Sequence, residues 1–353
     1  MKYALLVSRT LSNGDVTGSK NIGDYIQSLA ADQFLPHVDE YYDKTADDCG
    51  TETVKMIMNG WYIWQPEKFP LSKRIIPLPI SMHISPVCAD KLLSLQNVVE
   101  WFKRNEPVGC RDKETEKLLN EHGINSYFSG CLTLTLGKKY KYKGEKKSLV
   151  FVDPYIASIR KKELTVLDFF KSFNFGLTHF KSYLQLLRKF NHNYCCGKLR
   201  LLKKTICTAI FLQTYSKLFS LQELTKADYF THIIKVGKGT NLTTEEDKMA
   251  YAEQLIKKYA ASKLVVTSRI HCALPCLGIE TPVIFTVGHA LEEGADASSA
   301  GRFGGLIDFF YVARISKTDI QKDFKLPTEN KNLYKKYAEA LEKKCEEFIL
   351  ERS

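Results

Sequence analysis

Segment 263–285 carries an arginine and a histidine two residues apart, where a predicted strand meets a predicted helix. Val265 and Val266 form the apolar run of a strand that is covered on both faces. The unpaired N–H groups at a helix start attract anions, and the Arg269 guanidinium adds a two-pronged donor for phosphate or carboxylate. The unperturbed pKa of histidine, about 6.5, suits His271 to exchange a proton beside that anion. The pattern predicts an anion-binding turn with acid–base chemistry.

The same residues also have a structural interpretation. Arginine and histidine are common in ordinary ion pairs and in satisfied polar networks of a protein core, so residue types alone leave both interpretations open. Thr267 or Ser268 is expected to cap the helix. Pro275 is expected in the first helical turn, where its missing N–H costs nothing, and Gly278 is expected to end the helix.

Three short motifs follow one another along the chain. They are NIGDYIQ at 21–27, GCRD at 109–112 with SGC at 129–131, and SRIH at 268–271 with the segment that runs on to 285. The last resembles the Ser-Arg-hydrophobic-His signature of the polysaccharide pyruvyl transferase family. The first is similar to the family's Asn-hydrophobic-Gly-Asp opening, and the second to its middle segment. The resemblance therefore spans most of the chain.

This resemblance implies transfer of the pyruvyl group of phosphoenolpyruvate to two hydroxyls of one sugar, with a cyclic ketal and phosphate as products. Arg269 and His271 would be the catalytic residues. Because the donor carries a phosphate and a carboxylate, a second cation is expected. The implied donor-binding residues are Ser268, Arg269, Ile270, His271, Arg160 and Arg302. Phosphoenolpyruvate is a co-substrate, and no cofactor and no metal are expected, since the chain has no Asp-x-Asp pair, His-Glu-x-x-His or P-loop.

The acceptor is expected on the first half of the chain. Asn21, Asp24 and Arg111 are the candidates there, and Glu292 and Glu293, ahead of a glycine-rich loop, could accept protons or bind sugar hydroxyls. The resemblance implies a galactose-type or related hexose in a capsular or exopolysaccharide precursor, such as a lipid-linked oligosaccharide.

The length of 353 residues exceeds what one hydrophobic core usually serves, so two domains are expected. Alternating strand and helix patterns predict an α/β fold of two Rossmann-like domains facing a cleft, which is the type B glycosyltransferase (GT-B) architecture that the resemblance also implies. The acceptor domain would cover 1–140, the donor domain 148–325, and a C-terminal helix 326–353. Strands are predicted at 3–7, 55–59, 108–111, 149–152, 233–236, 264–267 and 283–287, and helices at 24–34, 92–103, 114–121, 247–259 and 332–349.

A helical insertion is predicted at 166–224 in the second domain. Aromatic residues such as Phe169 and Phe170 alternate there with basic ones such as Lys171 and Arg188. Two interpretations remain open for this segment: an amphipathic helical pair packed on the domain, or a helical unit that lies in a membrane interface with its cations on lipid phosphates.

The balance of 51 Lys and Arg against 40 Asp and Glu gives a net charge of +11, which favours an anionic partner. No ordered basic and aromatic array matches a nucleic-acid module, and the ten cysteines form no metal-ligand pattern. A cytoplasmic protein is expected, peripheral at the inner membrane at most. A glycosyltransferase that uses a nucleotide sugar and a non-enzymatic anion-binding scaffold are the alternatives to a pyruvyl transferase.

Overall fold

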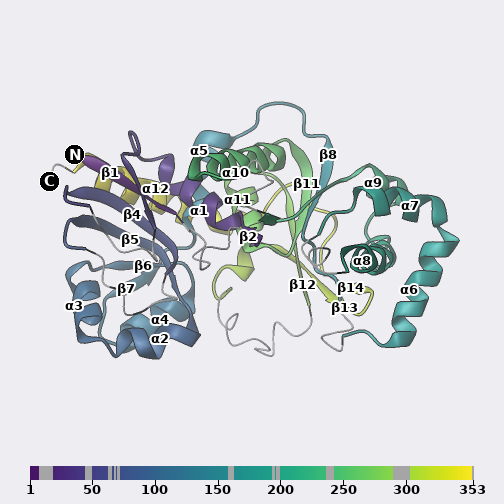
Figure 1. Ribbon diagram of the computed structural model, residues 1–353, viewed down its shortest axis with the longest axis horizontal. Coiled ribbons are helices and arrows are strands. Elements are labelled where there is room, and N and C mark those ends of the chain that lie inside the picture. Colours follow the sequence, from purple (N-terminus) through teal and green to yellow (C-terminus); the bar gives the residue numbers. More distant parts are fainter. Residues whose placement is uncertain are drawn as a thin grey trace.

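The computed structural model describes residues 1–7, 19–43, 50–62, 66, 69, 72–157, 163–192, 195, 199–235, 242–288 and 303–351, with only the backbone at 19, 20, 61, 62 and 235. These residues form two six-stranded, mainly parallel sheets with helices on both faces, which is a mixed α/β fold (Figure 1). Between the two sheets lie α1 (Gly23–Asp32), α10 (Glu245–Ala260) and α11 (Ile270–Gly278).

The first sheet is entirely parallel, with the order β3-β1-β4-β5-β6-β7. Its strands are β1 (Lys2–Val7), β3 (Glu40–Asp43), β4 (Val54–Tyr62), β5 (Ile75–Ile84), β6 (Val108–Cys110) and β7 (Ser126–Phe128). On its outer face, apolar side chains of α2 (Pro86–Leu93), α3 (Gln96–Arg104) and α4 (Lys113–Glu121) form a core with the strands. The strand order reverses between β1 and β4.

The second sheet repeats this arrangement, with the order β14-β13-β12-β11-β8-β9. Its strands are β8 (Ser148–Val152), β9 (Asp228–Phe230), β11 (Ser262–Thr267), β12 (Val283–Gly288), β13 (Tyr311–Ser316) and β14 (Asp319–Gln321), of which only β13 and β14 pair antiparallel. Its outer core is shared with α7 (Phe180–Lys189), α8 (Arg200–Tyr215) and α9 (Leu221–Lys226). Here the order reverses between β8 and β11. Ligands of open α/β sheets bind beyond the strand ends at such a reversal.

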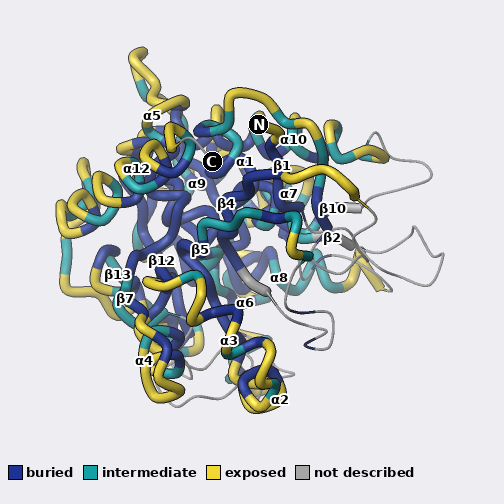
Figure 2. The backbone as a smooth tube through the Cα atoms, turned by 90° about the vertical axis from the view of Figure 1, so that its left-hand side faces the viewer, coloured by how far each residue is buried: buried dark blue, intermediate teal, exposed yellow. Residues whose placement is uncertain are grey.

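The two halves are joined by a third, shared core. Buried side chains of α1, α10 and α11 meet there with those of both sheets and of α12 (Lys335–Leu350). A short antiparallel pair of β2 (Ser19–Asn21) and β10 (Ile233–Lys235) also links the halves. The last helix returns to the first sheet, where Lys55 Nζ donates to the carbonyl of Phe348 at 2.8 Å. The two chain ends therefore lie side by side (Figures 1 and 2).

Most predicted elements are confirmed, but strands β2, β3, β5, β7, β9, β13 and β14 were not predicted. Segment 92–103 is not one helix, because α2 ends at Leu93 and α3 begins at Gln96. Segment 233–235 is a strand, but it pairs with β2 and does not extend the second sheet. Strand β5 was not predicted, because Pro77 and Pro79 interrupt its pattern. Strand β6 pairs with β5 only at Met82, which lies beyond both prolines. The edge of β5 that faces β6 therefore needs no backbone N–H donors at Pro77 and Pro79.

Most residues of the central strands are buried, and the exposed positions lie on the outer helices, on α12 and in the connecting loops (Figure 2). The predicted helical insertion is confirmed as α6 (Val166–Thr178), α7, α8 and α9. None of the helices in the described ranges is long and apolar enough to cross a membrane. The GT-B assignment and the domain boundaries at 140, 148 and 325 stay predictions.

Candidate functional site

Two strand ends meet where the order of the second sheet reverses. Asp153 follows β8 directly and Ser268 follows β11 directly, and these strands are parallel neighbours. The hydroxyl of Thr267 donates to the Val152 carbonyl at 2.7 Å, and the hydroxyl of Ser268 donates to the Asp153 carbonyl at 2.6 Å. The N–H of Arg269 donates to the Thr267 hydroxyl at 2.9 Å. These side chains join the two turns at the place where an open α/β sheet binds ligands.

An ion pair occupies this reversal point. Arg269 Nε donates to Asp153 Oδ2 at 2.9 Å, with side-chain exposures of 26% for the arginine and 1% for the aspartate. The backbone N–H of His232 donates to the same oxygen at 2.9 Å. Burial would raise the pKa of Asp153, but the charges of His192 and Arg269 and this hydrogen bond outweigh it and hold the pKa below its usual value. The carboxylate therefore stays ionised and orients the guanidinium.

One nitrogen of the Arg269 guanidinium forms no hydrogen bond within the described part of the chain. Its Nη2 atom is buried and has no hydrogen-bond partner among the described residues. A buried donor without an acceptor is costly, and a phosphate or carboxylate oxygen would satisfy it. The ion-pair interpretation of Arg269 is therefore confirmed through Nε, and its anion-binding role stays a prediction, for which Nη2 is the donor.

The start of α11 differs from the expected one. Arg269 is the N-cap residue, and neither Thr267 nor Ser268 caps the helix. Pro275 lies inside the helix and not in its first turn, so that expectation was wrong. His271 has φ −82° and ψ 15°, which breaks the helix four residues before the proline, where a regular helix would need the missing proline N–H. Gly278 ends the helix as predicted.

The Asn21–Asp24 motif lies against the SRIH motif. The N–H of Ile22 donates to the His232 carbonyl at 2.8 Å. A methyl group on Gly23 would be 3.1 Å from His271 Cβ and 3.3 Å from His232 Nδ1. Glycine therefore permits the close approach of α1 to the start of α11. The first and last motifs, expected on opposite domains, lie against each other at the junction of the two sheets.

Three residues at this junction are not among the predicted site residues. Asp153 could have been found from its position directly after the predicted strand 149–152. His192 is buried, with Nε2 2.8 Å from the Pro154 carbonyl, and burial lowers its pKa in spite of the nearby Asp153. His232 is buried with Nε2 3.0 Å from the Tyr259 hydroxyl. Neither histidine belongs to a recognisable motif.

A second buried polar cluster lies at the carboxyl ends of β5 and β6. His83 Nδ1 is 2.6 Å from Asp112 Oδ2, and Arg111 Nε is 3.6 Å from the same oxygen. Asp112 Oδ1 accepts from the N–H of Thr115 at 3.0 Å, which caps α4. Burial would raise the pKa of Asp112, but His83 and Arg111 hold it below its usual value. Arg111 is fully buried and its guanidinium donates no hydrogen bond to any described residue, so its acceptor-binding role stays a prediction.

Four predicted site residues, namely Arg160, Glu292, Glu293 and Arg302, lie outside the described residues. The roles of Asn21 and Asp24 toward an acceptor also stay predictions. Within the described ranges, no group of three or more His, Cys, Asp or Glu is placed to hold a metal ion.

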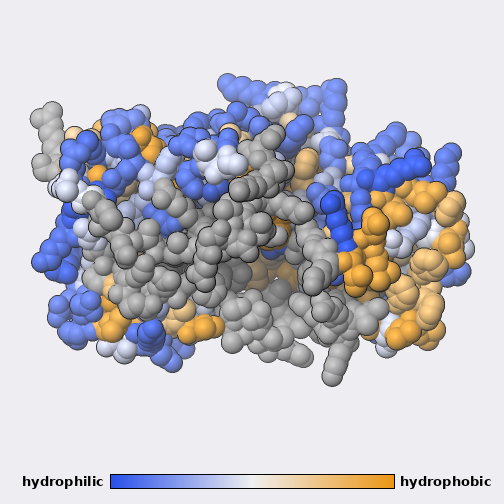
Figure 3. Space-filling model, viewed as in Figure 1, coloured by the Kyte–Doolittle hydropathy of each residue, from blue (hydrophilic) through white to orange (hydrophobic). Residues whose placement is uncertain are grey.

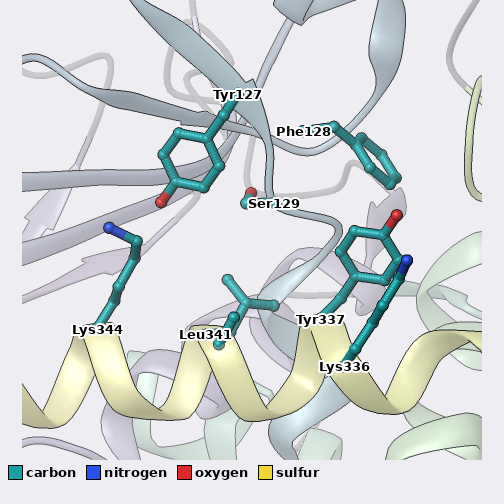
Figure 4. A pocket seen from close by; sticks show the side chains of 8 residues that line it. Tyr127, Phe128, Ser129, Lys336, Tyr337, Leu341 and Lys344 are labelled. Atoms are coloured by element: carbon teal, nitrogen blue, oxygen red, sulfur yellow. The ribbon is translucent and has the colours of Figure 1, made fainter.

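A cavity of about 310 Å³ lies elsewhere, between the end of β7 and α12. Tyr127, Phe128 and Ser129 form one wall, and side chains of α12, among them Tyr337 and Leu341, form the other (Figure 4). The lining is mainly apolar, and no catalytic or donor-binding candidate contributes to it. The assignment of the site therefore rests on the junction at Asp153 and Arg269.

Comparison with known proteins agrees with the motifs. Residues 21–289 match the sequence model of the family described as Polysaccharide pyruvyl transferase. No curated protein and no solved structure matches the chain.

Proposed function

Since the chain belongs to the polysaccharide pyruvyl transferase family, we propose that it moves the pyruvyl group of phosphoenolpyruvate onto two hydroxyls of one sugar. Membership makes the protein a transferase that acts on polysaccharide. The observation that carries the finer proposal is the Asp153–Arg269 pair at the strand reversal, with the guanidinium Nη2 still without a partner among the described residues. The donor has two anionic groups that suit such a site.

In the proposed reaction the terminal methylene of phosphoenolpyruvate takes up a proton and becomes the methyl group of the ketal. Carbon 2 then carries positive charge, and one sugar hydroxyl adds to it and loses its proton. Phosphate leaves with its bonding electrons, and the second hydroxyl closes the ring at the same carbon and releases the second proton. Arg269 holds an anionic group of the donor, and His271, beside it at the helix start, transfers protons.

Two further parts of the proposal concern the substrates. One of Arg160 and Arg302 supplies the second cation for the donor, and Ser268 and Ile270 contact it through groups at the start of α11. Asn21 and Asp24 bind hydroxyls of the acceptor, a galactose-type hexose of a lipid-linked oligosaccharide. The contact between Gly23 and His271 supports this, since it brings the acceptor motif next to the proton-transferring histidine. A cytoplasmic location fits the donor, which is a cytoplasmic metabolite.

The test is a reaction of the purified full-length chain with phosphoenolpyruvate and an oligosaccharide that ends in galactose. We expect phosphate release in step with an acceptor that gains the mass of pyruvic acid minus water. Phosphoenolpyruvate at about 100 times its dissociation constant should also stabilise the fold by about 2.7 kcal/mol. An acceptor that gains a hexose residue, and only from a nucleotide sugar, would contradict the proposal and establish a glycosyltransferase.

A further inference from the structure

Helix α6 exposes its large apolar side chains and buries its small ones. The only fully buried residues among its thirteen are Ser172 and Gly176. Its valine, leucine and phenylalanine side chains are all exposed or half-buried, and Phe170 has an exposed fraction of 59%. An ordinary surface helix turns its apolar face toward the core. The outer face of α6 therefore lacks the apolar partner that its composition would require.

This apolar face continues onto the neighbouring helices. Fourteen large hydrophobic residues of the described chain are exposed, and eight of them lie between 166 and 202. These eight, which we call the α6 surface, are Val166, Leu167, Phe170, Leu177, Phe180, Leu199, Leu201 and Leu202. Figure 3 shows hydrophobic side chains gathered over the end of the molecule that α6 forms. Patches of this kind on a soluble domain mark interaction sites.

The three helices that carry the α6 surface form one packed unit. The hydroxyl of Ser172 on α6 donates to Gln213 Oε1 on α8 at 2.6 Å. The hydroxyl of Tyr183 on α7 donates to the Thr205 carbonyl on α8 at 3.1 Å. Inner side chains of α7 and α8, including Leu186 and Phe211, complete the outer core of the second sheet. The packed and the interfacial interpretations of this segment are thus compatible, since its inner side packs and its outer side stays open.

The charge of the segment identifies the chemistry of its partner. Residues 166–219 contain nine lysines and arginines and one acidic residue, so eight of the eleven net positive charges of the chain lie there. The one acid, Asp168, caps α6 through Thr165 and pairs with Lys317 at 3.5 Å. Lys171, Lys181, Arg188 and Arg200 are exposed and form no ion pair with any described residue. A second copy of the chain would bring like charges together.

We propose that the α6 surface docks onto an anionic lipid bilayer. Its phenylalanine and leucine side chains enter the boundary between headgroups and acyl chains, and its lysines and arginines contact lipid phosphates. With thirteen residues, α6 is too short to span a bilayer and lies along it. This inference does not depend on the identity of the donor or the acceptor, and it goes beyond the proposed reaction.

The test is flotation of the purified full-length chain with vesicles, without donor or acceptor. We expect the protein to float with phosphatidylcholine vesicles that contain about 30% phosphatidylglycerol, and much less with pure phosphatidylcholine or at about 0.5 M salt. The double variant Phe170→Ser, Phe180→Ser should lower the partition coefficient about tenfold. The double variant Lys171→Glu, Lys181→Glu should remove the preference for phosphatidylglycerol.

Matched controls lie on other parts of the molecule. Val87→Ser removes an apolar side chain of similar exposure, 61%, from α2, and Lys258→Glu reverses an exposed charge on α10. Both should float like the wild type, and thermal unfolding should show that all variants are folded. Wild-type protein that stays unbound, or controls that lose as much binding, would overturn the proposal. So would light scattering that finds a wild-type dimer and a monomeric Phe170→Ser, Phe180→Ser variant, because the surface would then bind a second copy.

Discussion

At the scale of single residues, the candidate site is organised around Arg269. Its Nε atom pairs with the buried Asp153, and its Nη2 atom, which has no partner among the described residues, is the donor that we propose for the anion. Removing the side chain altogether would leave a buried carboxylate without its partner, which destabilises proteins strongly. Arg269→Lys keeps the positive charge but removes the planar guanidinium, which can form two parallel hydrogen bonds to one anion. This substitution therefore separates the effect on ligand binding from the effect on stability.

We expect Arg269→Lys to bind phosphoenolpyruvate about 10-fold to 100-fold more weakly, since one charge-assisted hydrogen bond contributes about 1.5–3 kcal/mol. Isothermal titration measures the affinity, and chemical unfolding shows whether the variant remains folded. Arg104→Ala, at an exposed position at the end of α3, serves as the control and should bind normally. A folded Arg269→Lys variant with unchanged affinity would remove Arg269 from the donor site.

Asp153 gives a prediction that depends on pH. Its folded-state pKa is lowered, so its stabilising effect is fully present above the unfolded pKa of about 3.9 and is lost as the pH falls through the folded pKa. We expect Asp153→Asn to reduce the free energy of unfolding by about 2–3 kcal/mol at pH 7. The difference from wild type should shrink below about pH 4. Urea unfolding between pH 3 and 7 measures it, and a difference that does not vary with pH would contradict the assigned ion pair.

At the scale of elements, Asp112 connects β5, β6 and α4. It caps α4 through the N–H of Thr115, and it is the buried counter-ion of His83 and Arg111. A cap alone stabilises a helix by about 1 kcal/mol, whereas loss of a buried charge partner costs more. The cluster therefore holds the strand ends of the first sheet and the following helix in one geometry.

We expect Asp112→Ala to lower the free energy of unfolding by about 3 kcal/mol. Ser220→Ala, which removes the cap of α9 at an exposed position, should cost about 1 kcal/mol and is the matched control. Urea denaturation of the three proteins compares them directly. If both variants lost the same amount, Asp112 would act only as a helix cap.

At the scale of the whole molecule, the two sheets are joined by a close backbone contact. The end of α11 packs on the 3-10 helix Leu132–Thr135, which follows the SGC motif of the first half. A methyl group on Gly278 would be 2.4 Å from the Leu134 carbonyl oxygen, closer than any normal contact. Glycine at this position therefore permits the contact between the halves, in addition to its role in ending α11.

Gly278→Ala should lower the free energy of unfolding by about 1–3 kcal/mol, because the added methyl forces the two backbones apart. Gly144→Ala is the control, since the three atoms nearest to its methyl would all belong to the flexible Tyr142 side chain, and it should change stability by no more than about 0.5 kcal/mol. Thermal and urea unfolding provide the comparison. A Gly278→Ala variant as stable as wild type would mean that α11 and the 3-10 helix Leu132–Thr135 can move apart without a loss in the free energy of unfolding.

The sequence by itself determined the local features of this protein. Apolar runs located β1, β8, β11 and β12 within a residue or two, and the SRIH motif was placed correctly between a strand and a helix. These features depend on residues that are neighbours along the chain, and the spacing of hydrophobic residues indicates directly whether a segment forms a strand or a helix. Elements whose local pattern is overridden by tertiary contacts were not predicted. Strand β5 is one of them, because its prolines are tolerated only since β6 pairs with it beyond them.

Only the tertiary structure decided which distant residues come together at the candidate site. Asp153 and Arg269 are 116 positions apart, and their pairing depends on β8 and β11 being neighbours in the sheet. The contact of Gly23 with His271 depends on how α1 and α11 share the central core. The return of α12 to the first sheet likewise depends on that core. Such contacts follow from the arrangement of whole elements, and the spacing of residues along one element carries no information about them.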